Sequence, residues 1–243
     1  MPVEETGFMN TNRIAFCSLI VVLVMMLVPV GVMAFPPYKS TDADTADPWV
    51  FEMRVGLLRW KNDGGENEPI APLGRYNLGL PYRLEAIVEF EYSQDDHASD
   101  LAAGGKWIPF WWPEVSAGME VLALLPSGGQ DGMGVEAQAV ATWRNDTFQV
   151  HFNAGGFYDG RFEEPEKGWR AGTLVECCMD GCKPGIELFG KQVSGEDVQL
   201  SAGAGVIIPV GCLQLRIGAR AGITDSAPDF DASLWVAGKI PLK

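Results

Sequence analysis

The chain has 243 residues, and its 32 Asp and Glu against 18 Lys and Arg give a formal net charge of −14 at pH 7. Such an acidic chain has no electrostatic attraction for a phosphate backbone, so nucleic acid is not expected as a partner. The sequence contains only two His and five Cys, and no spacing among them predicts a metal site or a bound cofactor.

The first segment has the pattern of an export signal. Arg13 precedes an apolar run that ends in Val32-Met33-Ala34, and this order predicts a secretory signal peptide over residues 1–34. The alternative is an uncleaved membrane anchor, because the run is nearly long enough to span a bilayer. Pro29 and the small-residue exit favour cleavage after Ala34.

Beyond Ala34 the chain alternates between apolar and polar residues with period 2, which is typical of strands with two different faces. Within 83–92, for example, Ala86 and Val88 alternate with Glu85 and Glu89. Turn residues divide the chain into twelve such runs. The predicted strands are 49–60, 72–79, 83–92, 99–110, 114–125, 134–144, 147–158, 169–178, 184–193, 198–209, 212–223 and 231–240.

A soluble barrel with an apolar interior and a membrane barrel with a polar interior would show the same alternation. The connections favour the membrane barrel, because short joints alternate with longer polar loops, as in outer-membrane proteins. The short joints are 80–82, 111–113, 145–146 and 210–211, and the long loops are 61–69, 93–100, 126–134, 158–168 and 224–231. Aromatic residues near the strand ends agree with two interfacial girdles, although a soluble sandwich also favours Trp and Tyr there.

The predicted fold is therefore an all-β, transmembrane, antiparallel up-and-down barrel of about twelve strands. The barrel would occupy residues 49–243 in the outer membrane, after an N-terminal periplasmic segment over residues 35–48. Both termini would lie in the periplasm and most of the longer loops outside the cell.

Several stretches resemble a family of bacterial outer-membrane proteins labelled as belonging to the meta pathway of phenol degradation. The stretches are STDADTADPWVFEMRVGLLR, GLPYRLEAIVEFEY, ALLPSG and LSAGAGVIIPVGCLQLRIGARAGITDSAPDF. The resemblance covers most of residues 40–240, and it implies an outer-membrane transporter linked to the uptake of aromatic compounds. The last residues of the chain, Ile240-Pro241-Leu242-Lys243, differ from those of most outer-membrane barrels. They lack the C-terminal aromatic residue that the assembly machinery recognises.

If the apolar face meets lipid, the opposite face lines the lumen. The predicted lining contains eight acidic and seven basic residues. Spread along water, these charges would form a weakly selective pore, whereas interlocked charges would fill the lumen. The candidates are Glu52, Arg54, Glu85, Glu89, Glu91, Glu120, Glu136, Arg144, His151, Asn153, Arg170, Glu176, Glu187, Lys191, Arg216, Arg220 and Lys239.

Other chemistry is weakly indicated. Cys177, Cys178 and Cys182 could close a small disulfide in an oxidising compartment, and the alternative of a metal site has no neighbouring His to support it. His151 with Asn153 has the residue types of a catalytic pair, but residues two apart on a strand are about 7 Å apart. No enzymatic activity is predicted.

The predicted function is passive passage or uptake of small solutes across the outer membrane, with aromatic compounds suggested by the resemblance. The alternative is a filled, non-conducting barrel with a structural or ligand-binding role at the cell surface. The expected partners are outer-membrane lipid and lipopolysaccharide, the barrel-assembly machinery and a small-molecule solute. Acidic loop residues such as Asp95-Asp96 and Glu163-Glu164 could bind divalent cations that bridge lipopolysaccharide, engage a surface partner, or form a solvated rim.

Overall fold

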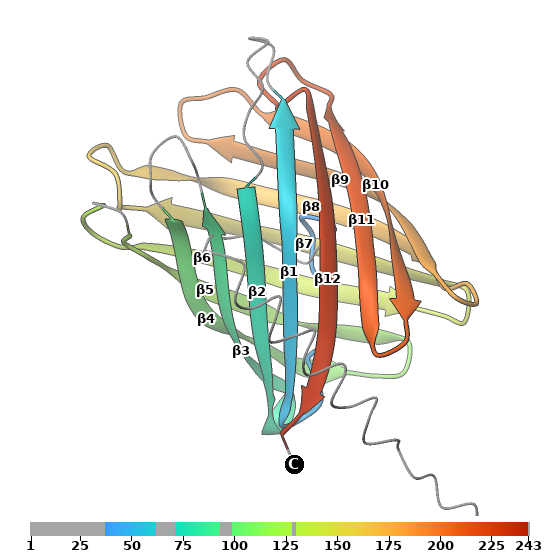
Figure 1. Cartoon of the computed structure of the whole chain (residues 1–243). Coiled ribbons are helices and arrows are strands. Elements are labelled where there is room, and N and C mark those ends of the chain that lie inside the picture. Colours follow the sequence, from blue (N-terminus) through green and yellow to red (C-terminus); the bar gives the residue numbers. More distant parts are fainter. Residues whose placement is uncertain (1–36, 62–70, 93–98, 128–129, 243) are drawn as a thin grey trace, which may run out of the picture.

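The computed structural model describes residues 37–61, 71–92, 99–127 and 130–242, and the predicted signal peptide lies outside them. The chain forms one closed barrel in which each strand pairs with its neighbours in sequence and β1 pairs with β12 (Figure 1). Every pairing is antiparallel. The strands are β1 (Val50–Lys61), β2 (Ala71–Leu80), β3 (Leu84–Tyr92), β4 (Ser99–Trp111), β5 (Val115–Leu125), β6 (Gly134–Arg144), β7 (Phe148–Asp159), β8 (Glu166–Cys177), β9 (Lys183–Val193), β10 (Gln199–Val210), β11 (Leu213–Gly222) and β12 (Phe230–Pro241).

The predicted fold class is confirmed, with twelve strands whose ends differ from the predicted ends by a few residues. Among the described residues, the only helical element is the short turn η1 (Pro81–Arg83) between β2 and β3. No helix in the described ranges is long and apolar enough to cross a bilayer.

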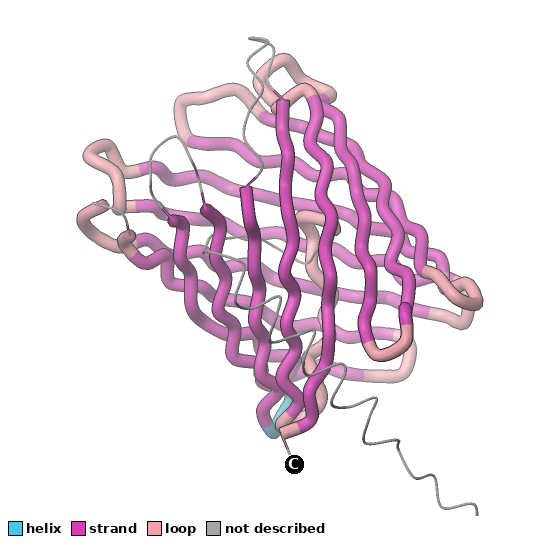
Figure 2. Tube along the Cα trace, in the orientation of Figure 1, coloured by secondary structure: helices cyan, strands magenta, loops and turns pink. Residues whose placement is uncertain are grey.

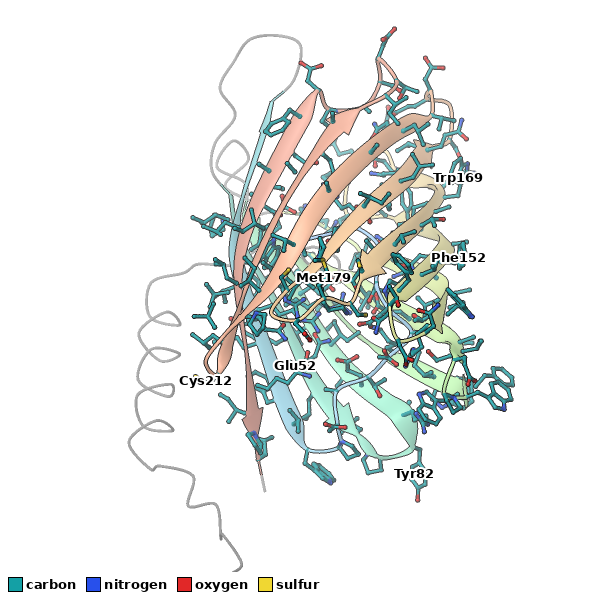
Figure 3. All side chains as sticks on the ribbon, turned by 90° about the vertical axis from the view of Figure 1, so that its right-hand side faces the viewer. Glu52, Tyr82, Phe152, Trp169, Met179 and Cys212 are labelled. Carbon is teal, nitrogen blue, oxygen red and sulfur yellow. The ribbon has the colours of Figure 1, made fainter. Side chains whose placement is uncertain are left out.

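The two faces of the wall have opposite chemistry. Large apolar side chains such as Val121 and Ile186 are 41% and 64% exposed, whereas Arg75 and Lys106 are 0% and 2% exposed. Figure 3 shows Phe152 and Trp169 pointing away from the barrel and Glu52 lying within it. A soluble barrel would bury its apolar residues, so this wall is that of a membrane-spanning barrel with a polar interior.

The connections confirm the two unequal rims (Figure 2). We call the end with residues 81–83, 112–114, 145–147, 178–182 and 211–212 the short-turn rim, and the opposite end the long-loop rim. The turn at 81–83 reverses the chain with positive φ at Tyr82 (63°) and Arg83 (57°). Non-glycine residues rarely adopt this conformation, so the turn is held by the strands on either side of it.

A bulge interrupts strand β4. Trp107 pairs with Met119 and Phe110 pairs with Ala117, so Ile108 and Pro109 face one residue, Gly118. Proline cannot donate a ladder hydrogen bond, which is why such residues are found at bulges. The extra residue turns Phe110 back to the outer face, where its side chain is 58% exposed.

A charge on the outer face should weaken the barrel. We expect Val121→Arg, near the middle of β5, to lower the free energy of unfolding by about 2–4 kcal/mol, because arginine is costly at the bilayer midplane. The measurement is urea unfolding of protein refolded into vesicles. Lys167→Arg on β8, an exposed residue that is already charged, is the control, and equal stabilities of the two variants would contradict a lipid-facing wall.

The segment before β1 lies inside the barrel. Residues 37–48, blue in Figure 1, are drawn within the ring of strands and continue directly into β1. Tyr38, Ser40, Thr41 and Ala43 are at most 4% exposed. The prediction of a periplasmic segment over residues 35–48 is therefore wrong for residues 37–48, which we call the luminal segment.

Candidate functional site

The luminal segment is bound to the wall through its backbone. Ser40 N–H donates to a Glu187 carboxylate oxygen at 2.6 Å, and Thr41 N–H donates to Asn153 Oδ1 at 2.5 Å. Asn153 Nδ2 donates in return to the Thr41 carbonyl at 2.7 Å. Inside a sheet these amides would pair with a neighbouring strand, but here polar side chains of the wall satisfy them instead.

Inward-facing glycines make room for the segment. A Cβ added at Gly172 would overlap Ser40 Oγ, and one at Gly218 would lie 2.8 Å from Pro37 Cβ. A Cβ at Gly185 would lie 2.6 Å from the Tyr38 hydroxyl oxygen. Strands β8, β9 and β11 thus each present a glycine where the segment passes, since any larger residue would displace it.

His151 belongs to the same set of contacts. Its Nδ1 lies 2.9 Å from Thr142 Oγ1, its Nε2 lies 3.1 Å from a Glu176 oxygen, and Ala43 N–H donates to Thr142 Oγ1 at 2.8 Å. Glu176 also accepts from Lys183 Nζ at 3.0 Å. A hydroxyl, an imidazole and a carboxylate in a row resemble a catalytic triad, but here the hydroxyl oxygen already binds the luminal segment, so the row anchors that segment.

The luminal segment also contains unsatisfied groups. Among the described residues, the hydroxyls of Tyr38 and Ser40 are buried and have no hydrogen-bond partner. Burial raises the pKa of the Tyr38 phenol, which keeps it neutral. A buried polar group without a partner costs about 1–3 kcal/mol, which offsets part of the stabilisation that the segment gains from its hydrogen bonds.

A dense charge network lies around Arg75, on the inner faces of β2 to β5. Its guanidinium contacts Glu89, donates to Glu120 at 2.7 Å and to Asn77 Oδ1 at 3.2 Å. Lys106 Nζ lies 3.8 Å from Glu120. All five residues are at most 2% exposed, so this part of the lumen is filled by interlocked charges.

Paired charges continue around the wall. Arg220 pairs with Asp231 at 2.5 Å and lies 3.7 Å from Glu187, while Arg170 pairs with Glu136. Lys191 Nζ lies 5.0 Å above the ring of Phe157, which faces the lumen. These contacts favour a narrow, structured interior over a wide water-filled one.

The half of the lumen towards the long-loop rim also contains apolar residues. Leu58, Leu73 and Trp235 form one buried cluster. A second buried cluster consists of Ile87, Ala102, Leu122 and Leu124. The predicted lining consisted only of polar and charged residues, so these apolar side chains are an addition that changes which solutes the lumen would favour.

A cavity of about 240 Å³ lies between the luminal segment and the wall, and we call it the vestibule. It is on the side of the short-turn rim, where Figure 3 shows Glu52 in the same half of the barrel as the turn at Cys212. Its lining residues are mostly charged. They are Asp42, Asp44, Thr45, Ala46, Glu52, Arg54, Glu85, Lys106, Lys183, Ile207, Gln214, Arg216 and Lys239.

A larger hollow, of about 610 Å³, belongs to the outer wall. Its lining is almost wholly apolar and includes the outward residues Phe152, Ala154, Trp169 and Leu188. This hollow faces lipid and is separate from the lumen, so it is not a candidate for solute passage.

The structure places the predicted lining residues on the inner face. Most are buried; Glu91, Glu136, Arg144, Arg170 and Lys191 are half-buried, and Lys239 is exposed. Arg144 donates to Asp44 of the luminal segment at 2.9 Å. Sequence reasoning did not select the inward residues of β2 and β4. Their alternation is weak because Gly74, Gly104 and Gly105 have no side chain. The residues missed are Arg75, Asn77, Lys106, Gln138, Thr142, Lys183, Asp231 and the two apolar clusters.

The cysteine turn between β8 and β9 has no disulfide in this structure. Cys177, Cys178 and Cys182 are free thiols, so the small disulfide predicted for an oxidising compartment is not formed here. Of the acidic loop residues, Glu163 and Glu164 are exposed between β7 and β8, and Asp95 and Asp96 lie outside the described ranges.

No protein-family model and no curated protein sequence matches the chain. The KdgM porin superposes with a TM-score of 0.60 at 7% identity, covering 76% of this chain and 98% of that one. The NanC porin superposes with a TM-score of 0.60 at 7% identity, covering 78% of this chain and 100% of that one. An outer membrane channel from Pseudomonas putida F1 superposes with a TM-score of 0.63 at 13% identity, covering 84% of this chain and 100% of that one.

At these identities the likeness shows the fold alone, which is that of the porin-like barrels of outer membranes. No match bears on the phenol-degradation family, so that resemblance stays a prediction.

Proposed function

We propose that this chain is an outer-membrane channel for small solutes, closed in the described state by its own luminal segment. The observation that supports the proposal best is how this segment is held. It crosses the lumen on side-chain hydrogen bonds to Glu187, Asn153 and Thr142, and it is not a strand of the wall. Moving the segment would open a path without breaking the barrel.

The lining indicates the kind of solute. A solute that enters at the long-loop rim meets apolar side chains around Trp235 and Leu122, and further on it meets the charged vestibule. Apolar surface favours solutes with an apolar part. This supports small solutes with a ring or short hydrocarbon portion, in agreement with the aromatic compounds implied by the family resemblance.

The proposal includes the location and the partners. We propose export through a cleaved signal peptide over residues 1–34, insertion by the barrel-assembly machinery, and an orientation with the short-turn rim in the periplasm. The apolar wall would contact outer-membrane lipid, and the long-loop rim would lie among lipopolysaccharide head groups.

The alternative is a filled, non-conducting barrel with a structural role. The buried network around Arg75 favours it, because interlocked charges rigidify an interior. Single-channel recording of the full refolded chain in planar bilayers separates the two functions. Discrete conductance steps, small in the wild type and larger when the luminal segment is loosened, support a channel, whereas no steps from either protein would leave only the structural role.

A further inference from the structure

The wall binds the main chain of the luminal segment at six consecutive residues, 39–44. Glu187 accepts from the N–H groups of Lys39 and Ser40, at 3.1 and 2.6 Å. Lys106 donates to the carbonyls of the two Asp residues further on, at 3.1 and 3.3 Å. Main-chain groups are the same in every peptide, so these contacts do not depend on which side chains the segment carries.

The middle of the segment is bound by Asn153 and Thr142. Thr41 donates its N–H to Asn153 Oδ1 and accepts from Asn153 Nδ2, at 2.5 and 2.7 Å. One side-chain amide thus pairs with the main chain as a residue of a neighbouring strand would. Ala43 N–H donates to Thr142 Oγ1 at 2.8 Å. Glu187, Asn153 and Thr142 lie on β9, β7 and β6, so the peptide path runs across the strands.

The space around the segment admits only small side chains at two places. Ser40 and Ala43 are both 0% exposed. Ser40 lies beside Gly172, and Ala43 packs against Ile108 and Val140. Because the Ser40 hydroxyl has no hydrogen-bond partner among the described residues, size and not polarity is selected at that place.

Two other places in the path favour acidic side chains. Lys106 Nζ lies 3.3 Å from Asp42 Oδ1, and Arg144 donates to Asp44 Oδ1 at 2.9 Å. A neutral side chain at either place would leave a partly or fully buried cation with one carboxylate fewer, so the wall discriminates by charge there.

We propose that this path binds a short peptide supplied from outside the chain, with small side chains at the places of Ser40 and Ala43 and acidic ones at those of Asp42 and Asp44. The luminal segment then acts as an intramolecular competitor that occupies the path at rest. The inference rests on the proposed function in one respect, that the segment leaves the lumen, and it adds short acidic peptides to the solutes of the channel.

The test requires a chain whose own segment is loosened, because a tethered competitor has an effective concentration of about millimolar. Ser40→Pro, Thr41→Pro removes two main-chain N–H donors and leaves the wall unchanged. The probe is an acetylated and amidated peptide with the sequence of residues 38–45, YKSTDADT, and calorimetry on the full chain in detergent micelles measures its binding. We expect the loosened chain to bind it at least about tenfold more tightly than the wild type does.

Two changes test whether the main chain is what the wall recognises. The same peptide, N-methylated at the amides of its serine and first threonine, keeps every side chain but lacks two donors, and it should lose about tenfold of the affinity. Asn153→Leu in the loosened chain should cost about as much. Gln149→Leu on the same strand removes an amide that binds Lys183 and should leave the affinity unchanged.

The outcomes separate this site from the channel. Equal affinity of the loosened chain for the two peptides, or no binding of either, would overturn the peptide path. Peptide binding by a chain that never conducts would retain the path and overturn the channel. Conductance steps from a loosened chain that binds no peptide would retain the channel and overturn the path.

Discussion

The double substitution Gly172→Val, Gly218→Val is expected to open the lumen. Both glycines face the luminal segment, and a Cβ at either position would overlap Ser40 or Pro37. Overpacking of this kind costs about 1–3 kcal/mol per site, which lowers the population of the closed arrangement by at least about tenfold. Single-channel recording should therefore show larger or far more frequent conductance steps than the wild type.

The barrel itself should tolerate these changes, because valine is favoured in strands. Gly190→Val on β9 is the matched control. A Cβ there makes only ordinary contacts, the nearest at 3.6 Å to Leu200, so its conductance should equal that of the wild type. If the double variant conducts no more than Gly190→Val, the luminal segment is not what closes the lumen.

Replacing Arg75 with leucine is expected to have the largest effect on stability. The change would leave Glu89 and Glu120, which are both 2% exposed, without their main positive partner. Removing one member of a buried ion pair costs about 3–5 kcal/mol. Urea unfolding in vesicles should show this loss, and the band shift between unheated and heated samples in SDS gels should move to a lower temperature.

The control is the triple variant Arg75→Leu, Glu89→Gln, Glu120→Gln. It removes the uncompensated charges along with the cation, so it should recover much of the lost stability. Equal free energies of unfolding for Arg75→Leu and the wild type would mean that this network does not support the barrel.

The lumen combines features of an open pore and of a filled barrel, the two arrangements that the near balance of acidic and basic lining residues allowed. Its charges interlock around Arg75 and across Arg220 and Asp231, as in a filled barrel. Yet the element that crosses the lumen is a non-strand segment with two unsatisfied hydroxyls. A filled interior whose central element is not part of the wall is consistent with a channel that is closed at rest.

The sequence by itself determined the barrel and the chemistry of its wall. In the stretch from Val198 to Gly222, alternation separated the apolar face from Arg216 and Arg220, and the tight turn at 211 marked the hairpin. The short and long connections then indicated that the apolar face meets lipid. These features are local: side chains of a strand alternate between faces with period 2, and turn residues mark where the chain reverses. Neighbouring strands then follow one another around the barrel, so topology required no distant information.

Only the tertiary structure decided what fills the barrel. The luminal segment reads in the sequence as a short polar stretch, and its partners Thr142, Asn153 and Glu187 lie 99 to 147 residues away from the residues they bind. No periodicity links positions so far apart. The inward glycines 172, 185 and 218 were the available signal, but a glycine on a polar face has the same appearance whether water or another segment occupies the space beside it. Closure of the wall brings these positions to one place, and that closure decides whether the lumen is a pore, a packed core or, as here, a packed core with one removable part.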